Sequence, residues 1–160
     1  MKVLVDVEYG KDLIDVTYVE ELALFAMGQL DLSDSTEVSI VFIDNDHMAD
    51  YNFSYRGIEG PTDVLSFECD NLVDDFPAFD PFEASNSNEV YSLGDIAIAP
   101  DICLKQAGEF GNTFTEELSL LLIHGILHLC GYDHIDDDDA QKMETMQTEL
   151  LNLWGRTSNE

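Results

Sequence analysis

Positively charged side chains are scarce in this sequence. It has 6 Lys and Arg residues against 34 Asp and Glu residues among 160, and its formal net charge is −28 at pH 7. Proteins that bind nucleic acids over a broad surface normally present a basic face to the phosphates. The composition therefore argues against a general affinity for polyanions. Any action on a nucleic acid must be local, through a metal ion and the few cations present.

Cysteines and long apolar runs are also few. The three cysteines, Cys69, Cys103 and Cys130, are scattered and odd in number, which predicts no disulfide framework. The longest apolar run, 118–130, is shorter than the roughly 18 residues of a membrane span and contains two histidines. The first residues favour a strand over a signal peptide. We therefore expect a cytoplasmic protein that does not contact a membrane.

The chain has the length and apolar content of one globular domain, which we expect to span residues 1–160. Residue patterns predict strands at 2–8, 37–44, 64–67 and 91–99. Helices are predicted to begin at the capping boxes Thr17-x-x-Glu20 and Thr113-x-x-Glu116, after Asp44, at Pro100 and after the acidic run 136–139. Residues 70–92 are acidic and predict a long surface loop.

This order of elements predicts the α/β (α+β) class, with a small mixed four-stranded sheet packed with helices. The helix that begins at Thr113 is apolar nearly all round. A helix of that kind is buried, so we expect it at the centre of the fold.

Three of the four histidines lie in one stretch of that helix and the turn after it: His124, His128 and His134. Positions i and i+4 share a helical face, so His124 and His128 point the same way. Gly131 can end the helix, because glycine adopts the left-handed conformation freely. The turn then brings His134 back towards the other two. Three imidazoles with an open fourth position are typical of a catalytic zinc site, and we expect one Zn²⁺ per chain, although nickel, copper and iron also accept imidazole.

Other residues near this stretch have simpler interpretations. A lone histidine on an apolar helix is more often a core residue with a satisfied hydrogen bond, but three at this spacing favour a metal. Cys130 falls on the opposite helical face and is interpreted as a buried apolar residue rather than a fourth ligand. The acids of the run 136–139 are interpreted as complementing a helix dipole, not as a second metal site. His47 is interpreted as a surface or capping residue.

A zinc ion bound by three imidazoles lowers the pKa of its water to about 7, so hydrolysis is the expected reaction class. The histidine spacing equals that of the metzincin proteases, HExxHxxGxxH. Gly125 occupies the position of their general-base glutamate, which counts against a protease. Asp133 is a candidate for part of that role, or for a carboxylate that orients a ligand.

Arg56 is the candidate catalytic residue outside the histidine stretch. It lies in a Gly- and Pro-containing segment that we expect to form a loop before the third strand. A guanidinium pairs with phosphate through two hydrogen bonds and neutralises charge on a phosphoryl group. The alternative is an ordinary surface arginine.

Two segments resemble the signatures of the YbeY family of endoribonucleases. One is His124-Gly-x-Leu-His-Leu-x-Gly-Tyr-Asp-His134, and the other is Tyr55-Arg56 with Pro61-Thr-Asp-Val-Leu-Ser-Phe67. The resemblance extends from about residue 44 to 151. It implies a zinc ion on the three histidines, a functional role for Arg56, and single-strand-specific cleavage of RNA. The implied task is maturation of the 3′ end of 16S ribosomal RNA and ribosome quality control.

The sequence departs from the family at Glu68, where a proline is common, and in the length of the acidic segment 70–92. The expected partners are a ribosomal RNA precursor and the small ribosomal subunit or its proteins, which would supply the positive surface that this chain lacks. Two other functions stay open. One is a zinc-containing small-subunit assembly factor without nuclease activity, and the other is a metallopeptidase.

Overall fold

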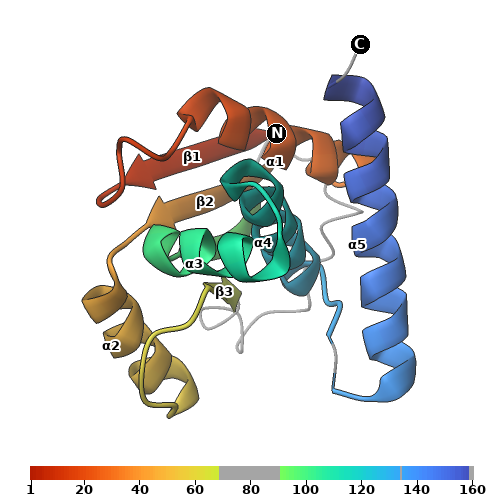
Figure 1. The fold of residues 1–160 in the computed structure, drawn as a ribbon. Helices are drawn as coiled ribbons and strands as arrows, with labels where there is room; N and C mark the ends of the chain where they lie inside the picture. Colours follow the sequence, from red (N-terminus) through yellow and green to blue (C-terminus); the bar gives the residue numbers. More distant parts are fainter. Residues whose placement is uncertain (69–90, 134, 159–160) are drawn as a thin grey trace.

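Four strands form one mixed sheet in this computed structural model, which describes residues 1–68, 91–133 and 135–158 (Figure 1). The strands lie in the order β1-β2-β4-β3. Their bounds are β1 (Lys2–Val7), β2 (Thr36–Phe42), β3 (Val64–Glu68) and β4 (Tyr91–Ile98). β1, β2 and β4 run parallel, whereas β3 pairs antiparallel with β4. The predicted mixed four-stranded sheet is confirmed. The acidic segment 70–92, predicted as a loop, lies outside the described residues except for Tyr91 and Ser92, which begin β4.

Five helices accompany the sheet in the described ranges. They are α1 (Val16–Gln29), α2 (Asn45–Arg56), α3 (Pro100–Phe110), α4 (Phe114–Leu129) and α5 (Asp137–Ser158). None of these helices is long and apolar enough to cross a membrane. The mixed α/β class is therefore confirmed, while the prediction of one domain over residues 1–160 stays a prediction.

The helix starts show which local signals the chain follows. The capping box at Thr113 is present: its side-chain oxygen accepts the N–H of Glu116, and the Glu116 carboxylate accepts the N–H of Thr113. The predicted start at Thr17 is wrong. Asp15 caps α1 by accepting the N–H of Tyr18, so Thr17 lies inside the first turn. The Asp15 carboxylate accepts one of the unpaired N–H groups of the first turn, as the Thr17 hydroxyl was expected to do, so the helix begins directly after Asp15.

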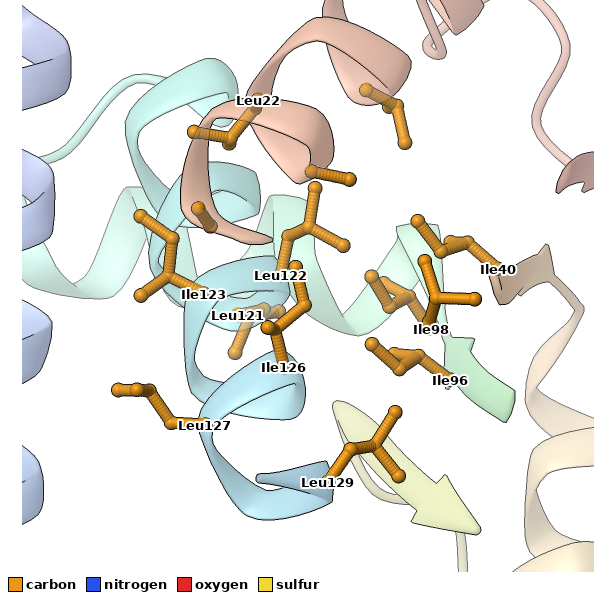
Figure 2. Packing of buried hydrophobic residues seen from close by; sticks show 14 of the residues in the cluster. Leu22, Ile40, Ile96, Ile98, Leu121, Leu122, Ile123, Ile126, Leu127 and Leu129 are labelled. Carbon is orange, nitrogen blue, oxygen red and sulfur yellow. The ribbon is translucent and has the colours of Figure 1, made fainter. Parts of the chain in front are cut away.

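The buried helix α4 packs against the sheet and against three other helices. It contacts β3 and β4 on one side and α1, α3 and α5 on its other sides. Figure 2 shows Leu122 and Ile126 pointing towards Ile96 and Ile98 of β4, and these four side chains are fully buried. This confirms the predicted central helix. Its burial holds the backbone that carries the histidines rigidly against the sheet.

The opposite face of the sheet is only partly covered. Its one small core cluster combines residues of the sheet with Met48 of α2 (the cluster comprises Ile43, Met48, Leu65, Ala97 and Ala99). Leu4 on β1 stays 41% exposed. The two faces of the sheet therefore differ: one carries the main core, and the other is open beside α2.

Candidate active site

The imidazole rings of the two histidines of α4 lie side by side, with their Nε2 atoms close together. Nε2 of His128 lies 3.1 Å from Nε2 of His124, and the ring centroids are 4.6 Å apart. The helix ends directly after them, because Gly131 adopts φ 97° and its N–H bonds the carbonyl of His128. This is the predicted left-handed turn. It directs the chain away from the helix axis immediately before position 134.

A glutamine on α5 orients His124. Oε1 of Gln147 lies 3.0 Å from Nδ1 of His124. An amide oxygen only accepts hydrogen bonds, so Nδ1 carries the proton and donates it. The lone pair of the neutral ring is then on Nε2, which is the atom that faces His128. An acceptor behind the ring is the usual support of a metal-binding imidazole.

The separation of the two histidine nitrogens fits a zinc ion. Two nitrogens bound to one zinc at about 2.0–2.1 Å lie about 3.3 Å apart in a regular tetrahedral arrangement. The separation of 3.1 Å is close to that value. His134, the predicted third ligand, lies outside the described residues. Over the described ranges no group of three potential ligands is found, so the three-histidine site stays a prediction.

Arg56 lines the same pocket as His124 and His128. The pocket has a volume of about 620 Å³ and extends between β3, α4 and α5. The predicted loop position of Arg56 is wrong: it is the last residue of α2. Gly57 ends the helix at φ 68°, and its N–H donates a hydrogen bond to the carbonyl of Phe53. The structure thus brings together residues that are 68 positions apart in the sequence.

The other charged residues of the pocket wall are acidic. Asp63, Glu68 and Glu117 line it beside Arg56. Glu117 is 1% exposed, and its carboxylate accepts a hydrogen bond from Asn112 at 3.3 Å. Three carboxylates against one guanidinium disfavour a phosphodiester unless a cation compensates them. A divalent ion on the histidines would supply that compensation.

The position after His124 is tightly packed against the sheet. A Cβ on Gly125 would lie 3.0 Å from Cγ2 of Ile96 and 3.3 Å from Oγ of Ser66. Ser66 also donates a hydrogen bond to the carbonyl of Gly125, which ties β3 to α4. A glutamate at this position would meet the sheet rather than enter the pocket. The packing therefore gives a structural reason for the missing protease base.

Comparison with known proteins decides the family. A family model described as endoribonuclease YbeY matches residues 11–155. The chain belongs to the YbeY family. An endoribonuclease YbeY of Frankia casuarinae is 38% identical over an alignment of 159 positions that covers 96% of this chain and 75% of that protein. One from Leuconostoc mesenteroides is 39% identical over 132 residues and 82% of each chain.

A solved structure supports the same conclusion. The solution structure of TM1509 from Thermotoga maritima superposes with a TM-score of 0.61 at 28% identity. The match covers 98% of this chain and 92% of that one. The resemblance seen in the two YbeY signatures is thus confirmed over nearly the whole chain.

The remaining candidate residues make local contacts. Asp133 accepts a hydrogen bond from the N–H of Ile135, and its predicted support of a ligand stays untested. Cys130 packs against the core, where burial raises the pKa of its thiol to about 12. Its packing against apolar side chains favours the apolar interpretation. Asp136 accepts the N–H of Asp139 at the start of α5, as a helix-terminal acid does.

Two residues of this pocket, Glu117 and Gln147, were given no role in the site from the sequence. Glu117 precedes His124 by seven positions, two helical turns, so helical spacing alone places it on the same face. Gln147 has no such signal, because it reaches His124 from a different helix. His47, the fourth histidine, pairs with Asp44 at the start of α2 and does not line the pocket, as expected.

Proposed function

We propose that this chain is a zinc-dependent endoribonuclease that cleaves single-stranded RNA in the maturation of ribosomal RNA. One observation carries the proposal: the paired Nε2 atoms of His124 and His128 lie in one pocket with Arg56, in a chain of the YbeY family. The specific task that follows from the family resemblance is trimming of the 3′ end of 16S ribosomal RNA, with a part in ribosome quality control.

The zinc ion would be held by His124 and His128, with His134 as the third ligand. When bound, it supplies a hydroxide at neutral pH and polarises a phosphoryl oxygen. Gln147 holds the His124 ring with its Nε2 lone pair towards the pocket. Arg56 binds the phosphate and neutralises the charge that develops on it during cleavage.

The acidity of the chain determines how it meets its substrate. With a net charge of −28, non-specific contact with RNA is unfavourable. We therefore infer that the chain acts on a ribosomal RNA precursor while it is bound to the small ribosomal subunit or its proteins, in the cytoplasm. These partners would provide the positive surface.

The competing function is a zinc-containing assembly factor that binds the small subunit and does not cleave RNA. The acidic pocket wall favours it if no metal enters. A metallopeptidase is disfavoured, since Gly125 occupies the position of the general-base glutamate in the metzincin motif.

The test is cleavage of a single-stranded RNA by the purified chain, with chelator and after zinc is restored. Arg56→Ala is compared with Arg156→Ala, which removes the same charge from an exposed position on α5. We expect activity that falls with chelator, returns with zinc, is lost in Arg56→Ala and persists in Arg156→Ala. One bound zinc per chain without any cleavage would support the assembly factor instead.

A further inference from the structure

The open face of the sheet carries a second pocket, separate from the one that holds the histidines. Its volume is about 410 Å³, within the usual range of small-ligand sites. Strand register places one row of its lining side chains across all four strands: Leu4 pairs with Ser39, Ser39 with Asp95, and Asp95 with Phe67. Paired residues in a sheet point to the same side. The row therefore forms the floor of an open groove.

Three aromatic rings stand at one end of this groove, and we refer to Tyr51, Tyr55 and Phe67 as the aromatic platform. The ring centroids of Tyr55 and Phe67 are 4.5 Å apart, and Tyr51 lies 6.1 Å from Phe67. Tyr55 is nevertheless 64% exposed. The platform thus presents a large apolar surface to solvent, held in place by contacts among its own rings.

The aromatic platform adjoins the catalytic pocket on two elements. On α2, Tyr55 is followed directly by Arg56, which lines the catalytic pocket. On β3, Phe67 lies between Ser66 and Glu68, and both of these neighbours also line the catalytic pocket. Successive strand residues point to opposite faces. A single edge strand therefore separates the platform from the residues that would hold the reacting phosphate.

The charges around the platform select against phosphate. The groove contains two carboxylates, Asp6 and Asp95, and no Lys or Arg is among the described residues that line it. Carboxylates repel a phosphate, but they accept hydrogen bonds from the amino groups of bases. Aromatic side chains on a sheet are a common surface on which proteins stack unpaired bases. The groove thus fits the neutral, ring-shaped part of a nucleotide and rejects its charged part.

We propose that the aromatic platform binds one nucleobase of the single-stranded RNA substrate, next to the phosphate held at Arg56. This inference rests on the proposed nuclease function and adds a subsite to it. Only a base that is not paired and can leave its stack reaches the platform. The platform would therefore give the enzyme its preference for single strands without requiring a basic surface.

The test combines a protein variant with a change in the RNA. Short single-stranded RNAs that each lack one base are cleaved by the zinc-loaded wild-type chain and by Tyr55→Leu. Loss of a stacked base costs about 5- to 150-fold. In wild type, we expect one abasic position beside the cleaved bond to lower kcat/KM by that factor. In Tyr55→Leu, the intact RNA should already show the loss, and the abasic RNA should show no further loss.

Two variants control this comparison. Phe53→Leu removes another exposed aromatic ring of α2, which is 60% exposed and does not line the groove. It should behave as wild type. Tyr55→Phe keeps the ring and should retain most of the activity. Wild-type behaviour of Tyr55→Leu, or equal losses in Tyr55→Leu and Phe53→Leu, would overturn the proposal.

Equilibrium binding separates this proposal from the nuclease function itself. Fluorescence anisotropy of the same RNAs is measured with the full chain in chelator, where no metal-dependent cleavage occurs. The platform is supported if wild type binds the abasic RNA more weakly than the intact RNA, whereas Tyr55→Leu binds the two RNAs equally. This conclusion holds even if zinc restores no cleavage. Equal binding of both RNAs to wild type refutes the platform even if zinc-dependent cleavage is present; the groove would then be left to a partner of another class, such as a basic protein.

Discussion

Replacing Gln147 tests the metal centre without touching a ligand. Its amide oxygen lies 3.0 Å from Nδ1 of His124 and belongs to a different helix, α5. In Gln147→Leu, Nδ1 loses its acceptor, so the ring is no longer held with Nε2 towards His128. Loss of such a supporting hydrogen bond typically weakens metal binding by about 10- to 100-fold. This corresponds to about 1.4–2.8 kcal/mol of binding free energy.

The assay is competition for zinc between the protein and a chromophoric chelator, which yields the dissociation constant of the ion. Gln147→Glu keeps an acceptor for the Nδ1 proton and should bind zinc at least as tightly as wild type. Gln141→Leu makes the same chemical change on α5 at a residue that lines a different pocket, so it should leave zinc affinity unchanged. Circular dichroism of each variant confirms that α5 is folded.

The outcome that refutes this reasoning is specific. If Gln147→Leu binds zinc as tightly as wild type and Gln141→Leu, the hydrogen bond does not support a metal ligand. Equal losses in both variants would mean that α5 acts through its general packing. Only a loss confined to Gln147→Leu, with recovery in Gln147→Glu, supports the role we assign to the side chain.

Three further predictions concern packing, protonation and the metal. Gly125→Ala should lower the free energy of unfolding by roughly 1 kcal/mol, because overpacking against Ile96 outweighs the helix preference for alanine. Gly28 has open space around it, so Gly28→Ala should raise the free energy of unfolding by up to about 1 kcal/mol. Denaturant unfolding measures both changes. The Asp44 carboxylate accepts a hydrogen bond from Nδ1 of His47 and raises the pKa of that ring, so Asp44→Ala should lower the His47 pKa in an NMR titration. In wild type this pair stabilises the fold below the ordinary histidine pKa, and the contribution disappears as pH rises through the raised value. Zinc at about 100 times its dissociation constant should stabilise the chain by about 2.7 kcal/mol in the same unfolding assay, and a chelator should remove that stabilisation. If zinc left the denaturant midpoint of unfolding unchanged, the folded state would have no metal site.

Local chemistry explains both the successes and the errors of sequence-based prediction here. The capping box at Thr113 was predictable, because cap and helix are neighbours along the chain. The start of α1 was not, since Asp15 and Thr17 offer similar acceptors and only the folded chain selects one. Arg56 was expected in a loop, but Gly57 lets α2 continue to it before the chain turns. Errors of this kind shift an element by one or two residues and leave the site composition intact.

The sequence by itself determined what depends on neighbours along the chain. Helical periodicity alone places His124 and His128 on one face, and composition alone determines the negative charge. Tertiary structure decided what those residues meet. Gln147 reaches His124 from α5, which packs against α4. Arg56 reaches the pocket from α2, which packs through Met48 against the other face of the sheet. The pairing of β3 with β4 likewise places Phe67 beside Asp95 on the open face of the sheet. Contacts between distant segments follow from packing the whole core, and no short stretch of sequence contains that information.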